Sequence, residues 1–133
     1  KDRHPDHEEA SKLVKKASFL SGLVKVRTEL KGINQEPTRP IHLLYSIQND
    51  YVKPDFIIDI SNYYEKKLES IHCFKSQFYD PNSKEKESFI SSKGFLNFIE
   101  SRSVELGHSI GVKYGEGFTI ESNLNIQSLK DII

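Results

Sequence analysis

The sequence has no methionine, no tryptophan and a single cysteine. Because methionine is missing even at position 1, we expect the chain to be a portion of a longer protein rather than a complete translation product. One cysteine cannot form an internal disulfide, which is typical of a protein in the reducing cytoplasm. That residue, Cys73, is flanked by apolar residues, and the pattern favours an inert buried thiol over a nucleophile.

An excess of charge of one sign is also absent, since 19 Lys and Arg residues balance 19 Asp and Glu residues. Without a summed positive field, neither nucleic acid nor an anionic membrane surface is expected as the principal partner. No apolar run approaches the roughly 20 residues of a membrane span, and residues 1–7 lack the apolar segment of a signal peptide. With 133 residues, the chain is long enough to bury a core, and we expect one cytoplasmic domain.

Apolar residues at helical and alternating spacing predict helices that alternate with strands. The first helix, expected at 6–21, carries an apolar stripe made of Ala10, Leu13, Val14, Ala17 and Leu20. The pattern further predicts helices at 62–78 and 86–106, a loop at 31–40, and strands at 23–29, 41–47 and 56–60. Strands that alternate with helices indicate an α/β layered fold.

The most distinctive cluster is Arg3-His4-Pro5-Asp6-His7, at the start of the first helix. Proline suits a first helical turn and pushes the residue before it into extended geometry, so we expect His4 in the loop and His7 inside the turn. A catalytic zinc site takes three protein ligands and leaves one position for water. One histidine would bind a metal, and the other would hydrogen-bond a substrate oxygen or move a proton. The alternative is an exposed helix start that happens to carry two histidines.

Asp59 lies near the end of the apolar run 56–60, which is typical of a buried strand. Ser61, two residues later, is the expected N-cap of the following helix. Strand ends are where α/β folds place their ligands. The sequence therefore leaves two interpretations of Asp59, a carboxylate that stabilises a turn and a residue of a binding site.

Further blocks follow the first cluster in order: Phe19-Leu20-Ser21-Gly22, Arg39-Pro40-Ile41-His42-Leu43, Pro54 to Ser61, Ser76-Gln77-Phe78 and Gly111 to Phe118. Together with Asp2 to His7, these blocks resemble the LmbE-like (PIG-L) N-acetylglucosaminyl deacetylases. The later blocks look most like the bacillithiol biosynthesis branch, which removes acetate from N-acetylglucosaminyl-malate. The resemblance implies that residues 1–133 are the C-terminal portion of a single deacetylase domain, with a Rossmann-like three-layer α/β fold and a largely parallel sheet.

The resemblance also implies roles for individual residues. His7 matches a zinc ligand, with zinc the expected cofactor and another divalent metal the alternative. His4 matches the group that stabilises the oxyanion or protonates the leaving amine, and Asp6 the carboxylate that orients and charges it. Arg39 matches an arginine that holds the substrate, and Arg3 is assigned to substrate binding with it. Because family members often form symmetric oligomers, we expect the longer protein to be a homo-oligomer.

Two features depart from the family pattern. The upstream His-Pro-Asp-Asp-Glu-like motif, which supplies the other two zinc ligands and the aspartate base, is absent, so this chain alone is expected to be inactive. Phe95 stands where relatives often carry a tyrosine near the substrate. The rival interpretations are a non-catalytic sugar-conjugate-binding domain of the same fold, and a family deacetylase that acts on another N-acetylglucosaminyl substrate.

Overall fold

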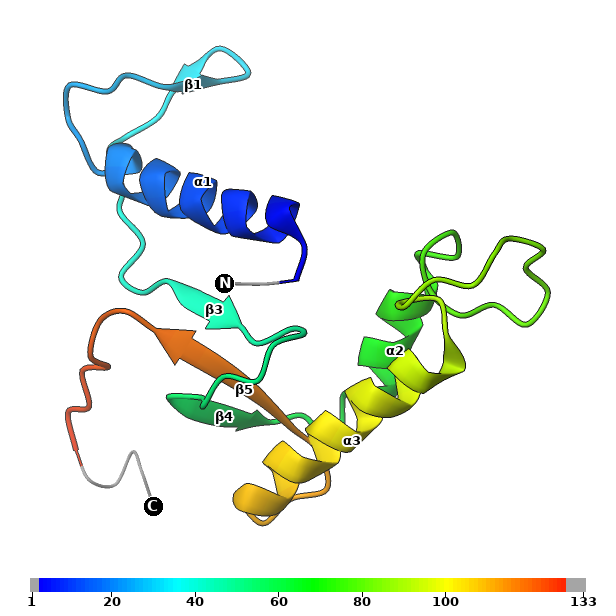
Figure 1. The fold of residues 1–133 in the computed structure, drawn as a ribbon. Helices are drawn as coiled ribbons and strands as arrows, with labels where there is room; N and C mark the ends of the chain where they lie inside the picture. The colour runs from blue at the N-terminus through cyan, green and yellow to red at the C-terminus, as the bar shows by residue number, and fades with distance from the viewer. Residues whose placement is uncertain (1–2, 129–133) are drawn as a thin grey trace. The chain divides into compact units, whose positions relative to one another are not determined.

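The computed structural model describes residues 3–128 and has mixed α/β content, in agreement with the expected class (Figure 1). Its elements are, in order, α1 (Pro5–Ser21), β1 (Glu29–Leu30), β2 (Ile33–Asn34), β3 (Leu44–Ser46), β4 (Phe56–Asp59), α2 (Tyr64–His72), α3 (Lys93–Ser109) and β5 (Gly115–Ile120). They divide into two compact units, one made of Lys1–Asp55 with Phe118–Ile133 and the other of Phe56–Gly117. None of the helices within residues 3–128 combines the length and apolarity that crossing a bilayer requires.

Helix α1 confirms the predicted helix at 6–21, but it contacts its unit through an unexpected face. None of its residues is buried, and Leu13 and Val14 of the apolar stripe are 68% and 55% exposed. The half-buried positions are Ser11, Ser18 and Leu20, and of these Ser11 and Ser18 are seven residues apart and therefore lie on one side of the helix. The small polar face packs, and most of the apolar stripe faces outward.

A polar cluster anchors this face of α1 to the strands of the first unit. Lys15 extends its ammonium group to the Glu121 carboxylate, with 2.7 Å between Nζ and Oε1. The Tyr45 hydroxyl on β3 donates to the same oxygen at 3.1 Å. The hydrogen bond from Lys15 lowers the pKa of Glu121, whereas burial and the bond to Glu121 raise the pKa of Tyr45. A charged side chain, rather than an apolar one, thus connects α1 to the sheet.

The segment expected as a loop at 31–40 begins with a tight hairpin. Glu29 pairs with Asn34 and Leu30 with Ile33 in antiparallel register. The two linking residues, Lys31 and Gly32, both have positive φ values, 52° and 78°. This is the pattern of a type I′ turn, whose twist matches that of the paired strands. The strand predicted at 23–29 was wrong apart from its last residue, because the turn chemistry shifts the paired segment toward the C-terminus.

Strand β5 is the central strand of a three-stranded sheet with the order β3-β5-β4 (Figure 1). Its last three residues pair with β3 in antiparallel register, from Ser46 opposite Phe118 to Leu44 opposite Ile120. On its other side, the Asp55 and Ile60 N–H groups donate to the Phe118 and Tyr114 carbonyls, so β4 also runs antiparallel to β5. The described pairs are antiparallel, and a largely parallel sheet stays a prediction for the longer protein.

Strand β4 and the helix after it differ from the predictions in local detail. Ile58 is 45% exposed and Asp59 is exposed beside it, so the strand expected to be buried is open at its C-terminal end in the described residues. Ser61 does not cap α2, which begins after Tyr63. The Ser61 hydroxyl instead accepts the Tyr114 N–H at 3.1 Å. A tertiary partner 53 residues away thus takes the side chain that local sequence assigns to a helix cap.

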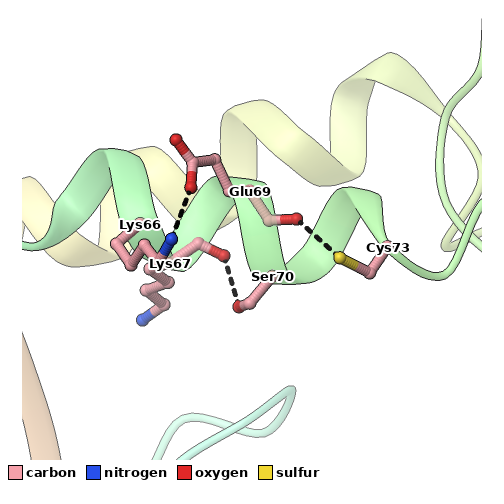
Figure 2. A network of polar contacts seen from close by, with 5 residues as sticks. All are labelled: Lys66, Lys67, Glu69, Ser70 and Cys73. Carbon is pink, nitrogen blue, oxygen red and sulfur yellow. Dashed lines mark hydrogen bonds and ion pairs between the residues drawn. The ribbon is translucent and has the colours of Figure 1, made fainter.

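Helix α2 ends at His72, six residues before the predicted end at Phe78. Its exposed face carries local contacts between neighbouring turns, which Figure 2 shows. Lys66 pairs with Glu69 at 3.0 Å, and the Cys73 thiol donates to the Glu69 carbonyl at 3.4 Å. Cys73 is exposed, so the expectation of a buried thiol was wrong, because the residue caps the end of a helix instead of lying within it.

The core of the second unit is small and centres on two tyrosines. Tyr64 and Tyr114 are buried, and their rings stack at 3.8 Å with an interplanar angle of 14°. Ile60 completes the buried cluster. Helix α3, expected at 86–106 but observed from Lys93 to Ser109, begins at an N-cap where the Ser92 hydroxyl accepts the Phe95 N–H.

Two glycines allow α3 and β5 to approach closely. A Cβ added at Gly107 would lie 2.8 Å from the Tyr114 Cα, and one added at Gly115 would lie 2.8 Å from the Gly107 backbone nitrogen. Real Cβ atoms essentially never come so close to backbone atoms, and the neighbours here have no flexible end that can move away. The helix therefore packs backbone against backbone on Tyr114 and on Gly115 at the start of β5.

We predict that Gly107→Ala destabilises the protein by about 1–3 kcal/mol, because the added methyl overpacks this contact. Gly94→Ala is the matched control in the same helix, since its Cβ would meet only the Ser92 hydroxyl at 3.7 Å. Both substitutions remove a helical glycine, so the gain in helix propensity is comparable. Urea unfolding monitored by circular dichroism measures the difference in stability between the two variants. Equal stability would contradict the close contact between Gly107 and the Tyr114 backbone.

We also predict an alkaline loss of stability that depends on Tyr64. Burial raises the pKa of Tyr64 to about 12, and the Glu100 charge adds to the shift. The folded state thus favours the protonated phenol, and this stabilisation is complete below the unfolded pKa of about 10 and is lost as the pH rises toward 12. Tyr64→Phe keeps the stacked ring and should reduce the fall in the urea midpoint over that range. Tyr51→Phe, at an exposed tyrosine, should behave like the unmodified chain.

Candidate functional site

The start of α1 places the two histidines of the motif in different backbone states, as the proline predicts. His4 is the N-cap, with extended angles of φ −98° and ψ 127°, and Pro5 opens the helix. His7 lies in the first turn, where its N–H donates to the His4 carbonyl at 3.1 Å. The two rings lie with their centroids 5.4 Å apart and tilted by 36°. Both residues are exposed, and the structure therefore brings their imidazoles together at an open helix end.

His4 acts as a side-chain cap of its own helix. Its Nδ1 accepts the Asp6 backbone N–H at 3.2 Å, whereas the Asp6 carboxylate lies 3.8 Å from the same nitrogen. A nitrogen that accepts a hydrogen bond carries no proton, so neutral His4 holds its proton on Nε2. The backbone of Asp6, more than its carboxylate, orients the ring. Arg3 directly precedes His4 and is exposed.

His7, at this helix end, is the residue for which the resemblance implies a zinc ligand. Within residues 3–128, no group of three or more His, Cys, Asp or Glu side chains is arranged to hold a metal ion. A catalytic zinc requires three protein ligands, and His7 is one exposed imidazole on a helical turn. The described residues therefore do not form a complete metal centre by themselves.

Arg39 lies at the opposite end of α1 from the histidines. Its guanidinium donates from Nη2 to the Phe19 carbonyl at 3.0 Å, and its Cζ lies 4.7 Å from the centre of the Phe19 ring. Twelve residues separate Phe19 from His7, which is about 18 Å along a helix. The structure thus does not bring Arg39 together with His4, Asp6 and His7.

The contacts of Arg39 fit a role in holding the end of the helix. The carbonyls of a last helical turn lack partners within the helix, and an arginine that donates to one of them also complements the helix dipole. Gly22 leaves room for this packing, because a Cβ there would lie 2.7 Å from the Arg39 Nε. A side chain at position 22 would require the Arg39 side chain to shift from this position.

The contacts of Asp59 favour the first of its two interpretations, a carboxylate that stabilises a turn. Its Oδ1 accepts the Ser61 N–H at 2.8 Å, the pattern of an Asx turn. Hydrogen bonding from Ser61 lowers the pKa of this exposed carboxyl. The carboxylate stabilises the connection between β4 and α2 by accepting the Ser61 N–H within that connection.

Tyr114 and Glu116, from the last block of the resemblance, have structural partners in the second unit. The Tyr114 hydroxyl donates to the Glu100 carboxylate at 3.4 Å. The Glu116 carboxylate accepts from the Lys67 ammonium at 2.9 Å, and both side chains are partly shielded from water. Sequence reasoning did not predict this pair, because 49 residues separate its members and neither lies in a local pattern.

Phe95 lies at the centre of an aromatic cluster in the second unit. Its ring centroid is 5.3 Å from that of Phe89, 6.0 Å from that of Phe98 and 6.1 Å from that of Phe78. The Arg102 guanidinium covers the Phe98 ring at 4.5 Å. Aromatic packing therefore explains a phenylalanine at this position without reference to a substrate.

No protein-family model matches the chain. Solved structures are similar to it, among them the following two. A conserved protein from Thermus thermophilus has 29% sequence identity and a TM-score of 0.71, with 97% of this chain and 50% of that chain covered. The N,N'-diacetylchitobiose deacetylase from Pyrococcus horikoshii, solved with an inhibitor, has 25% identity and a TM-score of 0.65, with 99% and 46% covered. The chain thus spans about half the length of each solved chain.

From the contacts of Arg39 we predict that Arg39→Ala lowers the free energy of unfolding by about 1–2 kcal/mol, because a charged hydrogen bond and a cation–π contact are lost together. Arg39→Lys should recover little of this loss, since an ammonium group lacks the planar fork that stacks and donates at once. Arg27→Ala, at an exposed arginine, is the control. Urea unfolding measures the free energy of unfolding of all three variants. If Arg39→Ala leaves that free energy unchanged, Arg39 does not stabilise the end of α1.

Proposed function

We propose that the chain is part of an LmbE-like deacetylase that hydrolyses the acetamide of an N-acetylglucosaminyl conjugate. The observation that carries the proposal is the similarity of 99% of the chain to a solved diacetylchitobiose deacetylase at 25% identity. The ordered sequence blocks, which begin at the His4-Pro5-Asp6-His7 motif, support the same family independently. Because the chain spans about half of that deacetylase, we assign the activity to a longer protein. The proposal takes residues 1–133 as its C-terminal portion, as the resemblance implies.

In this proposal the start of α1 forms one side of the active site. His7 would supply one metal ligand, and the remaining ligands would come from other parts of the longer protein. Zinc is the proposed cofactor, with another divalent ion as the alternative; when bound, such a metal polarises a carbonyl and lowers the pKa of a water. The Rossmann-like, largely parallel sheet expected from the resemblance belongs to the same proposal.

The residues of this chain then have distinct tasks. His4, with its Nδ1 held by the Asp6 N–H, presents Nε2 as the donor toward a carbonyl oxygen that gains negative charge. Proton transfer to the departing amine is the second task, and it requires the doubly protonated ring, because a neutral imidazole that gave up its Nε2 proton would be left as an anion. In that form Nδ1 also carries a proton and no longer accepts the Asp6 N–H, and the Asp6 carboxylate, 3.8 Å from Nδ1, is the acceptor beside it.

Of the two arginines assigned to the substrate, Arg3 is the better placed. It directly precedes His4, whereas Arg39 holds the far end of α1 through Phe19. A planar guanidinium matches a carboxylate such as that of a malate aglycone, which is why we propose N-acetylglucosaminyl-malate, the bacillithiol precursor, as the substrate.

Two alternatives remain distinct from this proposal. The first is another N-acetylglucosaminyl substrate for the same enzyme class, which the similarity to the diacetylchitobiose deacetylase from Pyrococcus favours. The second is a non-catalytic sugar-conjugate-binding domain, in keeping with the incomplete ligand set within residues 3–128. A cytoplasmic homo-oligomer, without nucleic acid or membrane as partner, completes the proposal.

The test uses the longer protein encoded by the continuous reading frame. We expect about one zinc per chain by elemental analysis, and acetate release from N-acetylglucosaminyl-malate faster than from N,N'-diacetylchitobiose. His7→Ala should lose metal and activity together. His4→Ala should keep the metal and release acetate more slowly by a factor of about 100 or more, since a general acid contributes at least that factor. His108→Ala, at an exposed histidine of α3, is the control.

Each result has a defined meaning. Unchanged zinc content in His7→Ala would refute the ligand assignment. Loss of metal in His4→Ala would exchange the roles of the two histidines. A longer protein that binds the sugar conjugate without metal and without acetate release would be the non-catalytic domain. Faster turnover of diacetylchitobiose would keep the deacetylase and replace its substrate.

A further inference from the structure

The register of the sheet places two polar side chains of the first unit on the same face. Tyr45 of β3 lies opposite Thr119 of β5, and Glu121 follows Thr119 by two residues. Side chains two residues apart along a strand point to the same side, so Glu121 is the diagonal neighbour of Tyr45. The 3.1 Å hydrogen bond from the Tyr45 hydroxyl to the Glu121 Oε1 agrees with this placement. This face of the sheet therefore presents a held carboxylate to Lys15 of α1.

Polar contacts hold α1 near its C-terminal end and at its middle. In the last turn, backbone carbonyls accept from the Thr38 N–H and from the Arg39 guanidinium. At the middle of the helix, the Lys15 Nζ lies 2.7 Å from the Glu121 Oε1. A helix that is attached near one end can still turn about its axis. The second attachment, to a strand end, limits that rotation.

His7 lies on the side of α1 that carries this attachment. Lys15 follows His7 by eight residues, which is about 80° around the helix and about 12 Å along it, and the half-buried Ser11 lies between them. Turning a helix by about 10° moves an atom at its outer radius of about 5–6 Å by about 1 Å. A zinc–nitrogen distance tolerates only about 0.2 Å. The rotation of α1 therefore decides whether the His7 imidazole can meet a metal that other ligands hold.

We propose that Lys15 is a positioning residue for His7, because its pairing with Glu121 fixes the rotation of α1 and with it the direction of the imidazole. The inference rests on the proposed function, in which His7 is a metal ligand. Tyr45 belongs to the same arrangement, since its hydroxyl donates to the carboxylate oxygen that Lys15 contacts. The hydrogen bond between Lys15 and Glu121 raises the pKa of the amine and lowers the pKa of the carboxyl, so the pair is ionised at neutral pH.

A purely stabilising ion pair would behave differently from a positioning one. The Lys15 and Glu121 side chains are 58% and 52% exposed, and ion pairs with such exposure add little to stability. Lys12 offers a matched control, because its side chain is 61% exposed and its partners, Glu8 and Glu9, belong to the same helix. Replacing Lys12 removes ion pairs without releasing α1 from the sheet.

The test measures the zinc affinity of the longer protein by competition with a chelator. We expect Lys15→Met to weaken zinc binding by a factor of about ten or more, as the loss of a residue that orients a metal ligand typically does. Lys12→Met should bind zinc as the unmodified protein does. Lys15→Arg, which keeps the positive charge, should retain most of the affinity.

Two further measurements separate position from stability. The visible absorption of bound cobalt depends on the geometry of its ligands, so it should change in Lys15→Met and stay the same in Lys12→Met. The urea midpoints of the two metal-free variants should be similar. If Lys15→Met folds poorly, Glu121→Gln gives the same comparison with a side chain of nearly unchanged size.

The double variant Lys15→Met with Glu121→Gln should bind zinc no more weakly than Lys15→Met alone, because both substitutions break one contact. Equal zinc affinities of Lys15→Met and Lys12→Met would overturn the positioning role and leave the deacetylase assignment intact. Additive losses in the double variant would overturn it as well. An unmodified longer protein that binds no zinc would refute the metal-dependent function, and this inference with it.

Discussion

Tyr114 is the residue on which the second unit depends, because its backbone and its ring each hold a different element. Its N–H donates to the Ser61 hydroxyl, and its carbonyl accepts the Ile60 N–H that extends the pairing of β4. Its ring stacks on Tyr64 of α2 at 3.8 Å. The missing side chain of Gly107 lets α3 approach the same backbone. One residue, directly before β5, thus joins two helices and a strand in a unit whose buried apolar cluster otherwise contains only Ile60 and Tyr64.

The sequence predicts those features that local physics decides. Pro5 and the helical spacing after it are sufficient for α1, and the same proline places His4 in extended geometry and His7 in the first turn. Features set by distant contacts were not predictable. Ser61 is an acceptable helix cap in isolation, but the backbone N–H of Tyr114, 53 positions away, takes its hydroxyl. The hairpin at Lys31 escaped prediction for another reason, since lysine seldom adopts the positive φ that this turn requires.

The candidate site shows the same division. The position of its two histidines follows from neighbouring residues, whereas the place of Arg39 depends on Phe19, 20 residues earlier in the chain. Because Arg39 follows a long loop, the sequence does not indicate whether its guanidinium contacts a ligand or the end of a helix. The sequence also did not predict that α1 packs through its polar face. An apolar stripe usually faces the core of its own unit, but Leu13 and Val14 of α1 are exposed.

The exposed side of α1 combines two features that local sequence explains separately. The described residues leave Leu13 and Val14 exposed, and they bring no group of three or more metal-ligating side chains together around His7. His7, Ala10 and Val14 follow the spacing i, i+3 and i+7, so the imidazole lies within one helical turn of the apolar residues. Pro5 and the helical periodicity are sufficient for this arrangement, because every residue in it belongs to one helix and no distant contact is needed.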